Sequence, residues 1–234
     1  MPPKVWIIIL NWNGWEATRD CLRSLEEVDY PNFETIVVDN ASTDGSVDQL
    51  VLRFPYIPII KNGTNLGFAG GNNVGILNAL RDEADYVLLL NNDTTVSRSF
   101  LRTLVEAVES DPNAGIANPK IYYADPRDRI WYAGGSFSLW RGFAKHRCQG
   151  RRDRGGSANP EEVTFATGCA LLIKSEVIRR IGLLDQRFFL VSEDTDWSIR
   201  VRQAGYRLLF VPAARIWHNE SYTVRKTSGK QLRD

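Results

Sequence analysis

Residues 5–10 read VWIIIL, an unbroken apolar run near the start of the chain. Two more runs without polar alternation follow, TIVV at 35–38 and YVLLL at 86–90. Such runs are typical of strands that helices cover on both faces, as in a parallel sheet. The segments between them space their apolar residues three and four positions apart, which predicts helices. Because strand and helix alternate, we expect right-handed βαβ units and an α/β fold with a mostly parallel central sheet flanked by helices.

The rest of the chain predicts further elements of the same domain. Its apolar runs and spacings indicate strands at 115–118 and 170–173, helices at 175–181 and about 195–204, and a last strand at 207–211. Because proline cannot donate a ladder hydrogen bond, we expect Pro212 to end that last strand.

Residues 119–160 differ in composition from the rest. Aromatic residues alternate in the first half of this region, and residues 151–156 (RRDRGG) are basic and rich in glycine. This pattern is typical of a hairpin and a mobile loop rather than of a core. A chain of 234 residues is long enough for one substantial core. We therefore expect a single domain over 1–234, with 119–160 as an inserted hairpin and loop.

Composition limits the partners of the protein. The 29 Lys and Arg against 28 Asp and Glu give a net charge of +1, so no global field would hold the chain on nucleic acid or on an anionic membrane. The three cysteines contain no CxxC pair, which argues against a disulfide framework and a structural zinc site. No apolar run is long enough for a signal peptide core or a membrane span. We expect a cytoplasmic protein with no nucleic-acid partner and with at most peripheral contact with the inner face of the membrane.

Polar clusters follow three of the predicted strands. They read NWNG at 11–14, DNASTDG at 39–45 and NND at 91–93. In open α/β sheets, ligands bind beyond the carboxyl ends of the strands, so these clusters predict one polar crevice. Asp39 follows a buried strand directly and could accept hydrogen bonds from a base or a ribose. Ordinary turn chemistry is the alternative for Asp39, and the better interpretation for Asp44.

The stretch NLGFAGGNNVG at 65–75 is a glycine-rich entry into a helix. Backbone N–H groups in such a segment can approach an anion or a ring closely. It is neither a GxGxxG motif nor a P-loop. Close packing of the glycines is the alternative, and the paired asparagines favour ligand contact.

Two other segments carry ionisable groups. SEDTDW at 192–197 places three carboxylates at the start of a predicted helix, more than capping of the helix dipole requires. One of them could be a general base, since crowding by neighbours raises a carboxylate pKa. Asp93 alone would usually be a turn residue, and a lone histidine such as His218 is more often structural than a ligand. Both nevertheless follow strands on the side where the polar clusters are expected to converge.

Taken together, these residues resemble the family 2 glycosyltransferases with the GT-A fold, and most closely their rhamnosyltransferase-like members. The matching segments run in order from Val5 to His218. They are ILNWNG, VVDNASTDGS, NLGFAGGNNVG, LLLNNDT, FATGCALLIKSEV and FFLVSEDTDWSIRVRQAGYRLLFVPAARIWH.

The resemblance implies an inverting transfer of a hexose, such as rhamnose, from a nucleoside-diphosphate sugar to an acceptor hydroxyl. Asp194 matches the catalytic base, and Asp93 and His218 match positions that hold Mg²⁺ or Mn²⁺. The residues implied for binding the nucleotide sugar are Asn11, Asn13, Asp39, Asn65, Gly67, Gly70, Asn91 and Asn92. Those implied for the transferred sugar and the acceptor are Thr167, Gly168, Glu193, Asp196 and Trp197.

The implied donor is linked to dTDP or UDP, because Asp39 could accept the N3–H of a pyrimidine. The implied acceptor is a glycan or a lipid-linked oligosaccharide, and residues 119–160 would shape its choice. Many relatives have DxD where this chain has Asn91-Asn92-Asp93, so the metal position holds a single carboxylate. One alternative is therefore a nucleotide-sugar or glycan binder with little or no activity. A sugar-nucleotide pyrophosphorylase is another, but residues 11–14 lack the basic glycine-rich loop that it would need.

Overall fold

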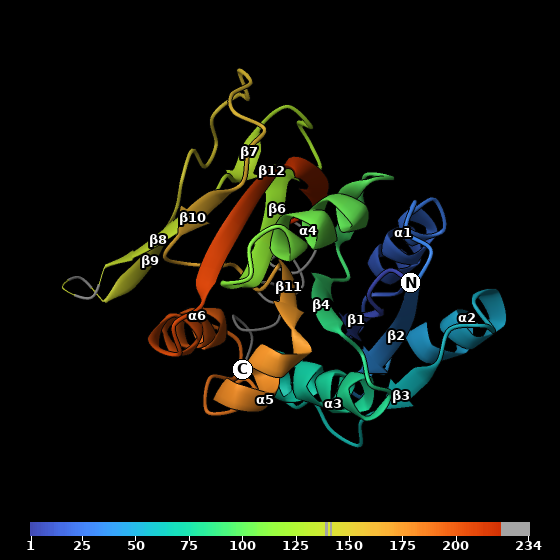
Figure 1. Ribbon diagram of the computed structural model, residues 1–234. Helices are drawn as coiled ribbons and strands as arrows, with labels where there is room; N and C mark the ends of the chain where they lie inside the picture. Colours follow the sequence, from blue (N-terminus) through green and yellow to red (C-terminus); the bar gives the residue numbers. More distant parts are fainter. Residues whose placement is uncertain (139, 141, 221–234) are drawn as a thin grey trace.

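The protein is described by a computed structural model over residues 1–138, 140 and 142–220. In this part of the chain, a central mixed sheet is covered by helices on both faces (Figure 1), which confirms the expected α/β fold. The predicted domain also includes residues 221–234, which lie outside the described residues. The helices are α1 (Trp15–Leu25), α2 (Ser46–Arg53), α3 (Gly67–Arg81), α4 (Phe100–Glu109), α5 (Ser175–Ile181) and α6 (Glu193–Gln203).

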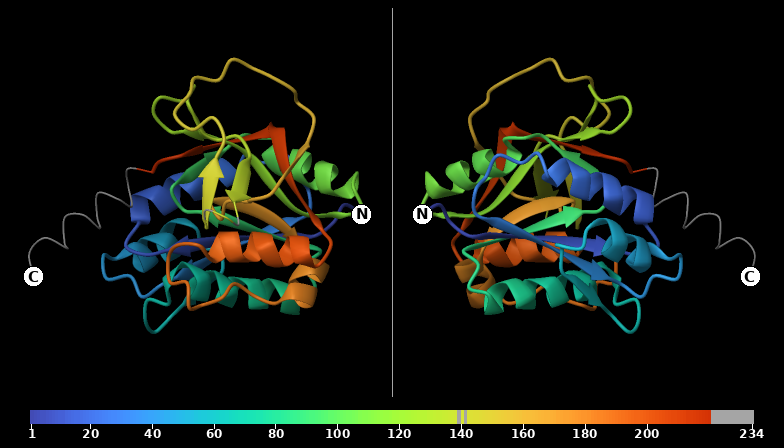
Figure 2. Two further views of the ribbon diagram at one scale, coloured as in Figure 1. Left: turned by 90° about the vertical axis from the view of Figure 1, so that its left-hand side faces the viewer. Right: turned by 90° about the vertical axis from the view of Figure 1, so that its right-hand side faces the viewer.

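Helices α1 and α4 cover one face of the sheet, and α3, α5 and α6 cover the other (Figure 2). The order of strands across the sheet is β10 (Glu161–Val163), β12 (Arg207–His218), β6 (Ala114–Tyr123), β11 (Ala170–Lys174), β4 (Tyr86–Asn91), β1 (Val5–Asn11), β2 (Phe33–Asp39) and β3 (Ile59–Lys61). Strand β5 (Thr94–Val96) pairs with the end of β12, and β7 (Ile130–Tyr132) pairs with β6.

The pairing of the strands brings the predicted polar clusters to one edge. β1 is parallel to both of its neighbours, with Asn11 opposite Asp39 of β2 and Leu10 opposite Asn91 of β4. β11 is antiparallel to both β4 and β6, whereas β6 and β12 are parallel to each other. The carboxyl ends of β1, β2, β4 and β12 therefore lie on the same side of the sheet.

Helix α3 packs unusually close to β1 because two of its glycines face that strand. A Cβ atom placed on Gly75 would lie 2.5 Å from Cγ2 of Ile8, and one placed on Gly71 would overlap Leu10. The two glycines are one helical turn apart and therefore lie on the same face. The glycine-rich segment thus serves packing at these two positions, in agreement with the packing alternative considered above.

Strands β6 and β12 are longer than the sequence pattern predicted. β6 continues through Pro119 to Tyr123, so the first five residues of the 119–160 region belong to the sheet. β12 continues to His218, and the prediction that Pro212 ends it was wrong. The ladder with β6 changes register between Val211 and Arg215, which takes Pro212 out of the regular pairing. An irregularity of this kind allows a strand to pass through a proline.

The expected hairpin consists of β8 (Gly135–Ser138) and β9 (Phe143–His146), which form a separate two-stranded sheet. It projects from one end of the molecule beside β10 (Figure 1). Its base is joined to the segment that precedes β11 by a bridge between Gly135 and Phe165. Among the described residues, no helix combines the length and the apolar character needed to cross a membrane.

Candidate active site

Asp39 lies at the end of β2 in a buried hydrogen-bond network. Its Oδ1 accepts bonds from Asn11 Nδ2 at 2.7 Å and from Ser42 Oγ at 2.6 Å, and its Oδ2 accepts one from the Ser42 N–H at 2.9 Å. Asn11 is fully buried and its Oδ1 accepts a bond from the Thr18 hydroxyl. Asn11 therefore positions Asp39, because its amide nitrogen donates to Asp39 and Ser42 and its amide oxygen accepts from Thr18. Asp39 keeps room for about one further donor, since a carboxylate has about four acceptor sites.

Asn13 connects the loops that follow β1 and β2. Its N–H donates to Ser42 Oγ at 2.8 Å, and its Oδ1 accepts a bond from the Thr43 N–H at 2.8 Å. Trp12 lies between Asn11 and Asn13 in the sequence, and half of its surface is exposed. An exposed indole beside a carboxylate is suited to stacking on a base, and the sequence predictions did not include it.

Asn92 holds the loop after β4 against α1. Its Nδ2 donates to Thr18 Oγ1 at 2.9 Å, the same hydroxyl that donates to Asn11. Gly14 allows this approach, because a Cβ atom there would lie 2.7 Å from Asn92 Nδ2. Asn91 is partly exposed beside it. The strand ends of β1, β2 and β4 are thus joined by side-chain hydrogen bonds into one polar wall.

The residues at the start of α3 are more enclosed than predicted. Asn65 Oδ1 accepts bonds from the Gly67 N–H at 2.9 Å and from Asn40 Nδ2 at 3.2 Å. Gly67 has φ +71°, and a Cβ atom there would overlap Phe189; one on Gly70 would lie 2.8 Å from Leu66 Cβ. In this structure Gly67 and Gly70 are therefore covered by protein rather than lining an open pocket.

Asp93 and His218 come from segments far apart in the chain and meet in the protein interior. His218 Nε2 lies 3.1 Å from Asp93 Oδ1, and both residues are buried. Burial lowers the pKa of His218, but Cys169 and Asp93 beside it outweigh that effect, and the pKa stands well above its ordinary value. Within the described ranges, no cluster of three or more His, Cys, Asp or Glu side chains could hold a metal by itself.

The Asp93 and His218 pair does match a metal that shares its coordination with a substrate. Mg²⁺ is usually held by one or two carboxylates and by phosphate oxygens. His218 Nδ1 is buried without a hydrogen-bond partner in the described part of the chain, whereas its Nε2 faces Asp93. Two protein ligands on one side would leave the remaining positions to a diphosphate.

Asp194 is fixed at the start of α6 by the segment that precedes β11. Its Oδ2 accepts a hydrogen bond from the Gly168 N–H at 3.0 Å, and Gly168 packs against the ring of Phe68. Burial raises the pKa of Asp194, although the bond from Gly168 opposes the shift. The next residue, Cys169, contacts His218. Residues 168 and 169 therefore connect the predicted base to the predicted metal position.

Thr167 directly precedes Gly168, and Glu193 directly precedes Asp194. Both residues are buried. The Thr167 carbonyl accepts a bond from Asn118 Nδ2 at 2.9 Å. Glu193 Oε2 is buried with no hydrogen-bond partner among the described residues, and burial and Asp194 raise the pKa of Glu193 to about 7. A neutral carboxyl beside Asp194 could donate a hydrogen bond, which an ionised one could not.

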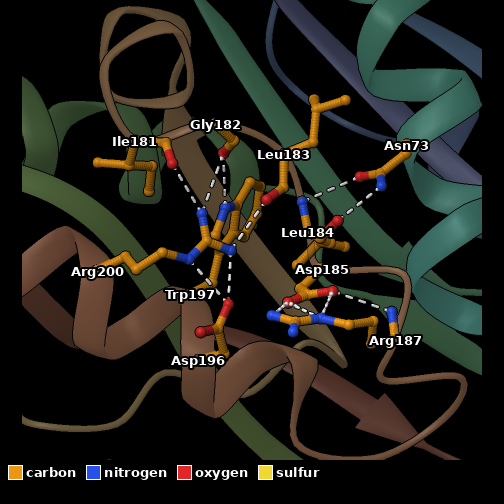
Figure 3. Close-up of polar contacts among 10 residues, drawn as sticks. All are labelled: Asn73, Ile181, Gly182, Leu183, Leu184, Asp185, Arg187, Asp196, Trp197 and Arg200. Atoms are coloured by element: carbon orange, nitrogen blue, oxygen red, sulfur yellow. Dashed lines mark hydrogen bonds and ion pairs between the residues drawn. The ribbon is translucent and has the colours of Figure 1, made fainter.

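The structure does not support sugar contacts for Asp196 and Trp197. Trp197 is fully buried, and its indole N–H donates to the Gly182 carbonyl at 3.0 Å. Asp196 forms a two-bond ion pair with Arg200, at 2.8 and 2.6 Å. Figure 3 shows the guanidinium of Arg200 reaching on to the carbonyls of Ile181 and Leu183. These side chains fasten α6 to the end of α5 and to the loop that follows it.

The same loop is also fastened to α3. Asn73 exchanges two hydrogen bonds with the Leu184 backbone, at 2.8 and 3.1 Å (Figure 3). Asp185 pairs with the side chain of Arg187 in the following turn. The segment that leads to the helix start of Glu193 and Asp194 is therefore held from both sides.

The structure thus brings the predicted site residues together in two groups. The first group is the polar wall, formed by Asp39, Asn13, Asn91 and Asn92. The second is a connected cluster, formed by Asp93, His218, Gly168 and Asp194. The sequence interpretation missed Thr18, Asn40, Ser42, Cys169 and Trp12. Ser42 and Asn40 belong to the polar cluster after β2, but their role as partners of Asp39 and Asn65 depends on loop geometry.

Comparisons with known proteins identify the family. The sequence model described as "Glycosyl transferase family 2" matches residues 6–182. The chain is 26% identical over 220 residues to the N-acetylglucosaminyl-diphospho-decaprenol L-rhamnosyltransferase of Mycobacterium tuberculosis, a match that covers 84% of this chain and 70% of that protein. It is 23% identical over 223 residues to the dTDP-rhamnosyl transferase RfbF of Shigella flexneri, covering 93% of this chain and 70% of that protein.

A solved structure supports the fold. The crystal structure of GalNAc-T7 with UDP, GalNAc and Mn²⁺ has a TM-score of 0.76 and 18% sequence identity, and the match covers 93% of this chain and 44% of that one. At this level of identity the likeness concerns the fold alone, and the fold is that of the GT-A glycosyltransferases. The match over residues 6–182 covers well over half of the sequence. The chain belongs to glycosyl transferase family 2 and is a glycosyltransferase that resembles rhamnosyltransferases.

Proposed function

We propose that the chain transfers rhamnose or a similar hexose, with inversion, from a nucleoside-diphosphate sugar to a hydroxyl of a glycan or a lipid-linked acceptor. One observation carries the proposal. Asp194 binds the Gly168 N–H, and the next residue, Cys169, contacts the His218 and Asp93 pair. The proposed base and the proposed site of the leaving diphosphate would thus lie on either side of two consecutive residues.

The chemistry follows from that arrangement. The acceptor hydroxyl gives its proton to the Asp194 carboxylate as its oxygen attacks the anomeric carbon. The bond between that carbon and the diphosphate oxygen breaks in the same step, and the electron pair leaves with the nucleoside diphosphate. A single displacement inverts the anomeric configuration. The raised pKa of Asp194 makes it a stronger base than an exposed aspartate.

We propose that Asp93 and His218 hold Mg²⁺ or Mn²⁺ together with the donor diphosphate. Such an ion, when bound, neutralises the charge that develops on the leaving group. The single carboxylate at this position agrees with an ion that arrives with the nucleotide. The relative crystallised with UDP and Mn²⁺ shares the fold and supports this expectation.

We propose Asn13, Asp39, Asn91 and Asn92 as contacts of a dTDP- or UDP-linked donor. Asn11 and Asn65 would act through their hydrogen bonds to Asp39 and Gly67. Thr167, Gly168 and Glu193 would surround the transferred sugar. One relative is named for dTDP-rhamnose and another for a diphospho-decaprenol acceptor, which favours a lipid-linked acceptor and work at the cytoplasmic face of a membrane.

Replacing the proposed base provides the direct test. Asp194→Asn keeps the shape of the side chain but cannot take up the proton, so we expect kcat to fall by about 10³-fold or more. Binding of the donor nucleotide, measured by isothermal titration calorimetry, should stay nearly unchanged. Asp48→Asn, an exposed position on α2, is the control and should keep full activity. Comparable turnover in Asp194→Asn would remove this residue from the role.

A binder of nucleotide sugars without activity is the second candidate, because the metal position has a single carboxylate. Mass spectrometry of donor sugars incubated with Mn²⁺ distinguishes the two. Hydrolysis or transfer of one donor supports the enzyme, whereas tight binding with neither reaction supports the binder.

A further inference from the structure

A groove of about 740 Å³ lies between the β8–β9 hairpin and β10, and Asp194 is not among the residues that line it. Its volume falls within the usual range for sites that bind small molecules. The residues used below are Lys145, His146, Arg147, Cys148, Arg151 and Glu162, all of which line it. None of them has a role in the proposed donor site, so the groove requires a separate explanation.

The groove is basic although the chain as a whole is almost neutral. Arg147 is held in place by bonds to the Ala133 carbonyl at 2.6 Å and to Glu161 at 2.7 Å. Lys145 and Arg151 are exposed, and neither forms an ion pair within the described residues. The opposing carboxylate, Glu162, is already paired with Arg207 at 2.8 Å. Because Glu161 already balances the charge of Arg147, the attraction for an anion comes from Lys145 and Arg151.

The groove is connected to the candidate active site by a row of aromatic rings. The His146 ring lies edge-on to Trp131, with centroids 4.5 Å apart, and Trp131 lies edge-on to His218 at 4.7 Å. Stacking on Phe165 holds His146 from the other side, with centroids 5.8 Å apart. The wall of the groove is thus one indole ring away from the proposed metal position.

We propose that this groove binds the phosphate or diphosphate group of a phosphate-bearing acceptor. The inference rests on the proposed function, because it supplies the second substrate of the transferase. The diphosphate of the donor is assigned to Asp93 and His218, so an anion beyond Trp131 belongs to the other substrate. The anion would belong either to a lipid-linked diphosphate or to a water-soluble phosphorylated glycan. Both carry the phosphate chemistry that the groove recognises.

Cys148 provides a local reporter for the test. It is partly exposed in the groove, whereas Cys21 and Cys169 are buried. The rate of Cys148 modification by a thiol reagent is measured in EDTA with inorganic pyrophosphate, farnesyl diphosphate or farnesol. We expect both diphosphates to slow modification several-fold, less so at high salt, and farnesol to have no effect. The Cys148→Ser variant confirms which thiol reacts.

Two double variants locate the binding. Lys145→Ala with Arg151→Ala should weaken protection by pyrophosphate about tenfold, because two cations are lost. Lys145→Arg should retain it. The matched control is Arg53→Ala with Arg202→Ala, which removes two exposed cations from α2 and α6. In this variant pyrophosphate should protect Cys148 as strongly as in the unmodified chain.

The outcomes separate the proposals. Tighter protection by farnesyl diphosphate than by pyrophosphate supports a lipid-linked source, and equal protection supports a soluble one. Absence of protection, equal protection in both double variants, or protection by UDP as strong as by pyrophosphate would overturn the assignment of the groove. Donor binding is measured independently by calorimetry with UDP or dTDP, so failure of the proposed function would be seen there and not at Cys148.

Discussion

Glu193 is a carboxyl group that folding places where its charge is poorly tolerated. Its pKa rises to about 7 from an ordinary value of 4.5, first because of burial and then because of Asp194. The folded state therefore holds a proton that the unfolded chain releases above pH 4.5. Folding stability contributed by this residue is unaffected below that value, falls as the pH rises towards 7, and stays reduced above it.

Glu193→Gln should remove this pH-dependent penalty. We expect little change in the free energy of unfolding at pH 4 and a gain of up to about 3 kcal/mol at pH 8, measured by urea denaturation. Glu27→Gln, at an exposed position, serves as the control and should change neither value. If the difference in the free energy of unfolding between the variant and the unmodified chain were the same at both pH values, Glu193 would be ionised without cost.

At the scale of elements, the contact between α3 and β1 depends on glycine. Gly75→Ala would bring a methyl group to 2.5 Å from Ile8, which cannot move easily because it is fully buried in the sheet. We expect a loss of about 1–3 kcal/mol of stability, although alanine is the better helix former. The measurement is thermal or urea unfolding. Gly63→Ala is the matched control, since a Cβ atom at Gly63 meets nothing within 4 Å. Equal stability of the two variants would contradict close packing at Gly75.

At the scale of the whole molecule, donor binding joins segments from both halves of the chain. Asp39 and Asn13 belong to the first half, and His218 to the last described strand. A nucleotide that binds only the folded state should therefore stabilise the domain by about 2.7 kcal/mol at a hundred times its Kd. For a chain of this size we expect the Tm to rise by about 5–10 °C with UDP or dTDP and Mn²⁺. Guanosine diphosphate is the control for base selectivity, and no shift with either pyrimidine nucleotide would contradict the donor site.

The sequence alone determined the layered α/β architecture, because unbroken apolar runs such as 5–10 and 86–90 are stable only when helices cover both faces of a sheet. It also indicated that Asn11, Asp39 and Asn91 stand at the ends of β1, β2 and β4. It did not determine that β12 passes through Pro212, since a change in register is a property of the paired strands. The end of β12 is decided by its pairing with β6 and β5, which the local pattern does not contain.

The tertiary structure decided what each polar residue does. Asn11 and Asp39 are both buried polar residues at strand ends, yet the Asn11 amide bonds Asp39, Ser42 and Thr18 and so supports Asp39. Trp197 and Asp194 lie three positions apart on α6, but only Asp194 faces Gly168. A residue type and its spacing define the chemistry that is available. Which side chains meet, and which remain open to a substrate, depends on contacts between segments far apart in the chain.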